Sequence, residues 1–134
     1  MDSGRHNFGL QKEKELKERI QSLVGETLND SEKRFALFDW TTDNYLVELK
    51  SRRAQYSHED FDEWVLPCCK ADLPSEKKKV FFYYWEQGNR LFRLDYNPES
   101  FATFKRARPF WTSQEHYFVP ADQFVEIDEP GTKN

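Results

Sequence analysis

The stretch FALFDWTTDNYLVELKSRR, residues 35–53, decides the predicted fold. It consists of two apolar runs separated by Thr-Asp-Asn at residues 42–44, and these residue types are typical of a tight turn between two strands. Three charged residues, Asp39, Glu48 and Lys50, lie where a buried strand would normally carry apolar side chains. Because side chains alternate along a strand, Glu48 and Lys50 are expected on one face of the sheet. That is the local geometry of a metal site with a cation beside it.

Whether Asp39 shares this face depends on the length of the turn. With an even-numbered loop, either residues 42–43 or residues 41–44, Asp39 stands opposite Leu46. It is then a diagonal neighbour of Glu48, roughly 7–8 Å away at the backbone, and two carboxylates at that separation can bind one divalent ion. A three-residue loop would send Asp39 to the opposite face. The predicted site therefore depends on the strand register.

This arrangement resembles the PD-(D/E)XK nucleases, a superfamily that includes restriction endonucleases and Holliday junction resolvases. Its signature is an Asp at the end of one core strand and Glu-x-Lys on the next, and the matching residues are Asp39, Glu48 and Lys50. The spacing of eight residues between Asp39 and Glu48 is short for the family, and Phe38 stands where the family often has Pro. The resemblance implies an α/β (mixed α+β) fold with a central mixed sheet of about four to five strands flanked by helices.

The resemblance also implies a cofactor and roles for these residues. Asp39 and Glu48 would bind Mg²⁺ or Mn²⁺, because carboxylate oxygens are the hard ligands that these ions prefer. Lys50 lies beside both carboxylates and is therefore expected to stay protonated. It would orient the attacking water and neutralise developing charge. The catalytic residues predicted from the sequence are thus Asp39, Glu48 and Lys50.

A helix is predicted over residues 10–28, because Leu16 and Ile20 recur with other apolar residues on one stripe. Glu13 lies on the apolar side of this helix, where a carboxylate needs a partner. In the resolvase branch of the superfamily an early-helix Glu reaches the metal, and Glu13 matches that place. The alternative is that Glu13 stays hydrated in the first turn, where its charge favours the helix dipole. Glu26 is the second acid of this helix considered as a ligand.

Basic residues cluster in two places that could contact nucleic acid. The first cluster continues the strand that carries the predicted site, and the second precedes Phe110 and Trp111, which could stack on bases. The residues predicted to bind nucleic acid are Arg52, Arg53, Lys105, Arg106 and Arg108. Alternatively, each cluster is a solvated surface, and the second is a structural loop anchored by its two aromatic rings.

The remaining chain is predicted to alternate between helices and strands. A helix is expected to start at Ser57 and to carry Phe61, Trp64 and Val65 on its apolar side. Residues 80–86 and 90–96 should form a hairpin around Gly88-Asn89, with the first strand central in the sheet. A short helix near residues 98–105, a basic loop at 106–111 and closing strands near 117–120 and 124–127 complete the prediction.

Composition limits the class of protein. The chain has 134 residues, 16% aromatic residues, 33% charged residues and a net charge of −4. This predicts a single domain over residues 1–134, with loose tails at 1–9 and 128–134. The sequence lacks an apolar run long enough for a membrane span and a signal-peptide core. The adjacent Cys68 and Cys69 are expected to be reduced thiols in a helix, which indicates an intracellular protein, cytoplasmic or nuclear and not secreted.

The predicted function is metal-dependent hydrolysis of phosphodiester bonds in nucleic acid, by an endo- or exonuclease, with DNA favoured. A homodimer is an option, because small nucleases often cut two strands as dimers. One alternative is a catalytically inactive nucleic-acid-binding or protein-interaction module of the same fold, in which Glu48 and Lys50 form a surface ion pair and Asp39 closes a turn. The other is an unrelated aromatic-rich α+β binding domain.

Overall fold

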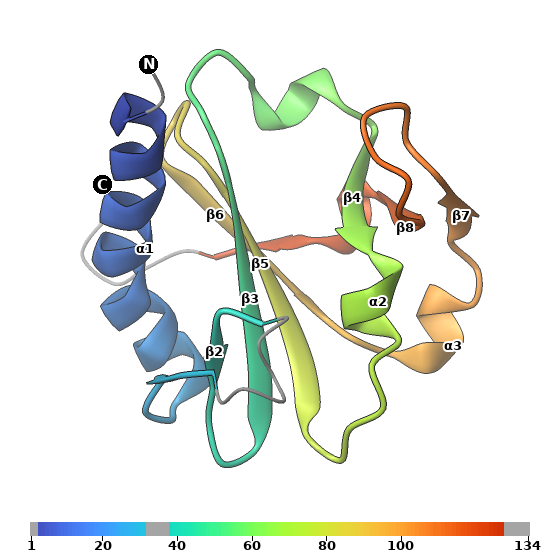
Figure 1. The fold of residues 1–134 in the computed structure, drawn as a ribbon, viewed down its shortest axis with the longest axis horizontal. Helices are drawn as coiled ribbons and strands as arrows, with labels where there is room; N and C mark the ends of the chain where they lie inside the picture. Colours follow the sequence, from blue (N-terminus) through green and yellow to red (C-terminus); the bar gives the residue numbers. More distant parts are fainter. Residues whose placement is uncertain (1–2, 32–37, 128–134) are drawn as a thin grey trace.

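The protein has a mixed α+β fold with two β-sheets (Figure 1). The computed structural model describes the backbone of residues 3–31 and 38–127, and side chains from residue 14 onward within those ranges. The side chain of Glu13, a predicted metal ligand, and residues 35–37 of the predicted first strand lie outside the described residues.

The elements follow one another in this order: α1 (Ser3–Val24), β1 (Asn29–Asp30), β2 (Trp40–Thr41), β3 (Tyr45–Arg52), the 3-10 helix η2 (His58–Asp60), β4 (Glu63–Pro67), α2 (Cys68–Ala71), β5 (Lys78–Trp85), β6 (Arg90–Asp95), α3 (Pro98–Phe101), β7 (Lys105–Ala107), β8 (His116–Pro120), the 3-10 helix η3 (Ala121–Gln123) and β9 (Val125–Glu126).

The larger sheet has six strands in the order β1-β2-β3-β5-β6-β9, and the smaller has three in the order β4-β8-β7. β3 and β5 pair in parallel, whereas their other neighbours in the larger sheet pair antiparallel, so the predicted mixed sheet is confirmed. In Figure 1 the helix α1 lies on one side of the larger sheet, and β4, α2, β7 and β8 lie on the other. The larger sheet is therefore the middle layer.

The apolar core is divided by this middle layer because side chains alternate along β5. Val80, Phe82 and Tyr84 belong to the cluster that packs with α1. The intervening residues, Phe81, Tyr83 and Trp85, belong to the cluster that packs with the smaller sheet. All of these side chains are buried, which confirms the prediction that this strand is central.

β3 follows the same alternation, with one exception that matters for function. Val47 and Leu49 pack toward α1. Leu46 packs toward the smaller sheet, and Glu48 and Lys50 follow it on that face at intervals of two residues. The expectation that Glu48 and Lys50 share a face is therefore confirmed.

The predicted helix starting at Ser57 is wrong. Ser57 does cap a helical turn, with the expected capping box to Asp60, but that turn is only η2. The next residues form β4, in which Trp64 pairs with Val119 of β8. Trp64 and Leu66 are buried two residues apart, so the period of this segment is that of a strand, and pairing with a distant strand overrides the local helical signal.

The ends of α1 and the segment around residue 106 also differ from the prediction. α1 begins at Ser3 and ends at Val24, after which Gly25 adopts a φ of +83° and donates its N–H to the Gln21 carbonyl at 2.9 Å. That geometry is a glycine helix terminus, so residues 25–28 leave the helix. Lys105–Ala107 form β7, whereas the sequence predicted a helix end followed by a loop.

Cys68 and Cys69 lie in α2 with free thiols, as predicted. Among the described residues, no helix combines the length and apolar character needed to span a bilayer.

The two sheets are joined through a buried tyrosine, and this contact can be tested. The Tyr83 hydroxyl donates to the Val65 carbonyl of β4 at 2.9 Å. We expect Tyr83→Phe to lower the free energy of unfolding by about 1–2 kcal/mol, because a buried hydrogen bond is lost and its acceptor loses that partner. Urea denaturation measures the change, and the exposed Tyr56→Phe is the matched control. Equal stability of both variants would contradict a structural role for this hydroxyl.

Candidate functional site

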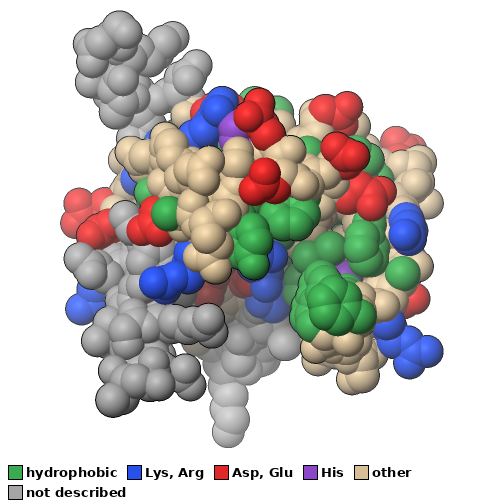
Figure 2. Space-filling model, turned by 90° about the horizontal axis from the view of Figure 1, so that it is seen from above, with side chains coloured by type: hydrophobic (Ala, Val, Ile, Leu, Met, Phe, Trp, Pro, Cys, Tyr) green, Lys and Arg blue, Asp and Glu red, His purple; other side chains and the backbone are tan. Residues whose placement is uncertain are grey.

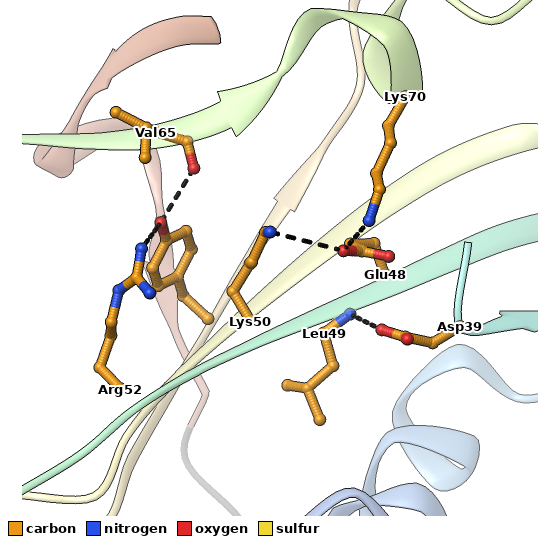
Figure 3. A network of polar contacts seen from close by, with 8 residues as sticks. Asp39, Glu48, Leu49, Lys50, Arg52, Val65 and Lys70 are labelled. Atoms are coloured by element: carbon orange, nitrogen blue, oxygen red, sulfur yellow. Dashed lines mark hydrogen bonds and ion pairs between the residues drawn. The ribbon is translucent and has the colours of Figure 1, made fainter. Parts of the chain in front are cut away.

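The turn between β2 and β3 determines how Asp39 meets Glu48. The strands pair with Trp40 opposite Val47 and Thr41 opposite Leu46. The loop is even-numbered, but the register differs by two residues from the predicted one, which placed Asp39 opposite Leu46. Continued by one residue, the observed register places Asp39 directly opposite Glu48. The Asp39 Oδ2 atom accepts the Leu49 N–H at 2.8 Å, which holds this carboxylate against β3 (Figure 3).

Glu26 explains why the turn takes this register. Its carboxylate accepts the Thr42 hydroxyl, the Asn44 backbone N–H at 3.2 Å and the Asn44 side-chain amide at 2.5 Å. The hydrogen bond from Thr42, followed by those from Asn44, lowers the pKa of Glu26. Glu26, which the sequence suggested as a possible metal ligand, therefore binds the β2–β3 turn to the segment that follows α1.

Glu48 is a buried carboxylate whose two oxygens have different surroundings. Its Oε2 atom accepts Lys70 Nζ at 2.5 Å and lies 3.9 Å from Lys50 Nζ. Its Oε1 atom is buried and has no hydrogen-bond partner among the described residues. Figure 3 shows both ammonium groups converging on one side of this carboxylate. A buried carboxylate oxygen without a partner is costly unless a further group binds it.

The environment changes the protonation of this cluster. Burial, and then the charge of Asp39, raise the pKa of Glu48 to about 7, although Lys70 and Lys50 act in the opposite direction. Burial also lowers the pKa of Lys50, while Glu48 raises it. The sequence predicted only the effect of the carboxylates on Lys50, because the burial of that position became visible only in the fold.

Lys70 is the member of the site that sequence reasoning missed. It comes from the short helix α2, which follows β4 in the smaller sheet. It is 22 residues from Glu48, and no motif connects the two. Only the packing of the smaller sheet on the larger one brings α2 to the Glu48 face of β3. No pattern in the sequence could therefore have predicted the contact between Lys70 and Glu48.

The residues present fit a hard divalent cation. Asp39, directly before β2, and the Glu48 Oε1 atom on β3 offer carboxylate oxygens, which are the donors that Mg²⁺ and Mn²⁺ prefer. Within the described part of the chain, no group of three or more His, Cys, Asp or Glu side chains could hold a metal. The remaining positions would be filled by water or by oxygens of a ligand, as is usual for Mg²⁺.

The first predicted basic cluster lies next to this site. Figure 3 shows Arg52 on the same side of β3 as Glu48 and Lys50. Its guanidinium donates to the Tyr83 hydroxyl at 3.3 Å and lies 5.5 Å from the centre of the Tyr83 ring. Arg53 follows the last residue of β3 and is partly buried.

The second predicted basic cluster lies on and after β7, in the smaller sheet. Arg106 pairs with Asp72 at 3.2 Å and with Glu115 at 2.9 Å, so it ties β7 to its surroundings. Lys105 lies over the Phe118 ring at 4.8 Å, and Arg108 is exposed. Arg106 thus has a structural role, which the sequence did not separate from nucleic-acid binding.

Comparisons with known proteins show a distant similarity in structure. No family model and no curated protein matches this chain. Among solved structures, the fold is similar to that of a nuclease from a fusselovirus, with 15% sequence identity and a TM-score of 0.47. The match covers 91% of this chain and 80% of that nuclease.

The raised pKa of Glu48 predicts how the stability of the metal-free protein changes with pH. The Glu48 carboxyl binds its proton more tightly in the folded protein than in the unfolded chain. The stability that the proton provides is therefore complete below pH 4.5 and is lost as the pH rises through about 7. Relative to wild type, Glu48→Gln should gain about 3 kcal/mol in the free energy of unfolding between pH 4.5 and a pH well above 7.

Urea denaturation in the presence of a chelator, at several pH values across this range, measures the difference. Glu63→Gln, which removes an exposed carboxylate on β4, is the matched control. If the free energies of unfolding of wild type and Glu48→Gln differ by the same amount at all pH values, the pKa of Glu48 is the same in the folded and unfolded states, and the prediction is wrong.

Proposed function

We propose that this protein is a metal-dependent nuclease that hydrolyses phosphodiester bonds, with DNA as the favoured substrate. The observation that carries the proposal is the buried Glu48 carboxylate, which is close enough to Asp39 for that charge to raise its pKa, has one oxygen without a partner among the described residues, and lies beside Lys50 on the same face of β3. The same three residues carry the resemblance to the PD-(D/E)XK nucleases. The proposal therefore rests on a sequence pattern and on a geometry that suits it.

Asp39 and Glu48 would hold Mg²⁺ or Mn²⁺. When bound, such an ion supplies Lewis acidity toward a phosphate oxygen and lowers the pKa of water. Lys50 would donate to a non-bridging phosphate oxygen and neutralise the charge that develops in the transition state. Because Lys50 is partly buried, its ammonium acts through a lower dielectric than on an open surface.

Lys70 would neutralise the Glu48 Oε2 atom and leave Oε1 for the cation. Two ammonium groups on one oxygen balance part of the charge that Asp39 and Glu48 bring together in a buried place. Without them, the cost of burying two carboxylates would favour protonation of Glu48 and weaken metal binding.

A second function is favoured by one observation. Both carboxylates already have protein partners, Asp39 through the Leu49 N–H and Glu48 through Lys70. A catalytically silent nucleic-acid-binding or protein-interaction module could carry the same cluster as a structural ion pair. The two functions differ in whether phosphodiester cleavage occurs.

Cleavage of labelled DNA and RNA, with Mn²⁺ or with a chelator, tests the proposal. Wild type should cleave only with metal, and Asp39→Asn, Glu48→Gln and Lys50→Met should each lose activity by about a hundredfold or more. Lys78→Met, which removes an exposed lysine at the start of β5, should cleave like wild type. Cleavage that persists in Glu48→Gln would exclude this site as the catalyst. Absence of cleavage in wild type would favour the silent module.

Lys70→Met gives a second, independent test through metal affinity. The Lys70 ammonium lies 2.5 Å from Glu48 and lowers the pKa of that carboxyl, so removing it lets a proton compete with the metal ion for Glu48. We therefore expect the variant to bind Mn²⁺ about tenfold more weakly than wild type near pH 7. Isothermal titration calorimetry measures this, with Lys78→Met as control. Unchanged affinity would place the Mn²⁺ site away from Glu48.

A further inference from the structure

A cleft of about 670 Å³ opens at the end of β3, beside the candidate site. Arg52 and Tyr83 line it from the larger sheet, and Trp64 and Val65 line it from β4. Figure 2 shows hydrophobic side chains grouped around a recess on this face of the molecule. The volume is that of a site for a drug-sized organic ligand, which is also the size range of a nucleoside.

The cleft collects the exposed rings of the protein. Among the described residues, five large hydrophobic side chains are exposed, and four of them line this cleft: Tyr56, Phe61, Phe110 and Trp111. Phe110 is 98% exposed and Trp111 is 57% exposed, so neither contributes much to the core. Exposed aromatic rings gathered at one place indicate a binding surface, since scattered ones would be ordinary.

One of these exposed rings, Phe61, is stacked on buried rings of the core. Phe61 stacks on Trp85 with 6.2 Å between ring centres, and Trp85 stacks on Tyr83 at 5.7 Å. Phe110 and Trp111 come from the β7–β8 loop and meet edge to face at 5.3 Å. The contact with Trp85 holds Phe61 in place, and a ring that is already held costs less entropy to order when a flat ligand binds against it.

The cleft is continuous with the row of charged residues on β3. Glu48, Lys50 and Arg52 follow one another at two-residue intervals on one side of the strand, which is about 7 Å per step (Figure 3). Arg52 belongs both to this row and to the lining of the cleft. A strand of nucleic acid with one phosphate at Lys50 would thus bring a neighbouring nucleotide to the cleft.

The charges around the cleft favour a base over the phosphate backbone. Asp60, Asp62 and Glu63 also line it, and they would repel a phosphate placed there. A neutral base is not repelled in this way, and Arg52 remains available for the phosphate beside it. Stacking of bases on aromatic faces tolerates any sequence, because every base has a π-face.

We propose that this cleft binds unpaired bases of the strand that the candidate site cuts, so that the substrate is single-stranded or locally unpaired nucleic acid. The cleavage part of this inference rests on the proposed function. The binding part rests on the rings and Arg52, and it can be measured without catalysis.

Fluorescence anisotropy in the presence of a chelator tests the binding part. The probes are a labelled single strand, the duplex of the same sequence, and an abasic strand of equal length that keeps the phosphates and lacks the bases. Wild type should bind the single strand about tenfold more tightly than the other two, because only that probe offers free bases. The double variant Phe110→Ala/Trp111→Ala should lose this preference. Val125→Ala removes an exposed apolar side chain outside the cleft and should keep it.

Two outcomes would overturn the inference. Equal affinity for the single and abasic strands would show that only phosphates are bound. Concentration-dependent dimerisation by light scattering, lost in the double variant, would show that a second copy of the chain covers the rings. Failure of metal-dependent cleavage together with intact base-dependent binding would instead contradict the proposed catalysis and leave the cleft as a single-strand site.

Discussion

The parallel pairing of β3 with β5 is the constraint on which the rest of the structure depends. It extends from Tyr45 opposite Lys78 to Arg52 opposite Trp85, and both strands are covered on both faces. A parallel pair needs cover on both sides, and α1 and the smaller sheet provide it. Because side chains alternate, the register of this pair assigns each residue of β3 to the helix layer or to the smaller sheet. The charged residues of β3 face the smaller sheet for this reason.

Burying the Glu48 carboxylate costs solvation free energy, and its protein partners offset only part of that cost. Lys70 and Lys50 neutralise one oxygen, the nearby Asp39 opposes ionisation, and the second oxygen has no hydrogen-bond partner in the described part of the chain. A purely structural ion pair would be expected to satisfy both oxygens, because an unsatisfied buried polar atom costs stability. The missing partner of the Glu48 Oε1 atom is the physical reason for proposing a function for this cluster.

The aromatic content serves two purposes. Among the described residues, most of the buried rings, such as Phe81 and Trp85, lie between the two sheets, where large side chains fill the space between twisted surfaces. A smaller group at the edge of the same interface stays exposed beside Arg52. The exposed Phe61 stacks on the buried Trp85, so at this point the cleft is a continuation of the core toward solvent.

The sequence by itself determined what depends on neighbours along the chain. The shared face of Glu48 and Lys50 follows from the alternation of side chains, and the central position of β5 follows from its apolar residues on both faces. The β5–β6 hairpin follows from Gly88-Asn89.

Only the tertiary structure decided what depends on distant partners. The carboxylate of Glu26 binds the β2–β3 turn, whose register differs from the one predicted, and pairing with β8 makes a strand of the segment around Trp64. The packing of the smaller sheet brings Lys70 to Glu48 and buries that carboxylate. These contacts join residues far apart in the chain, and no local pattern encodes their geometry.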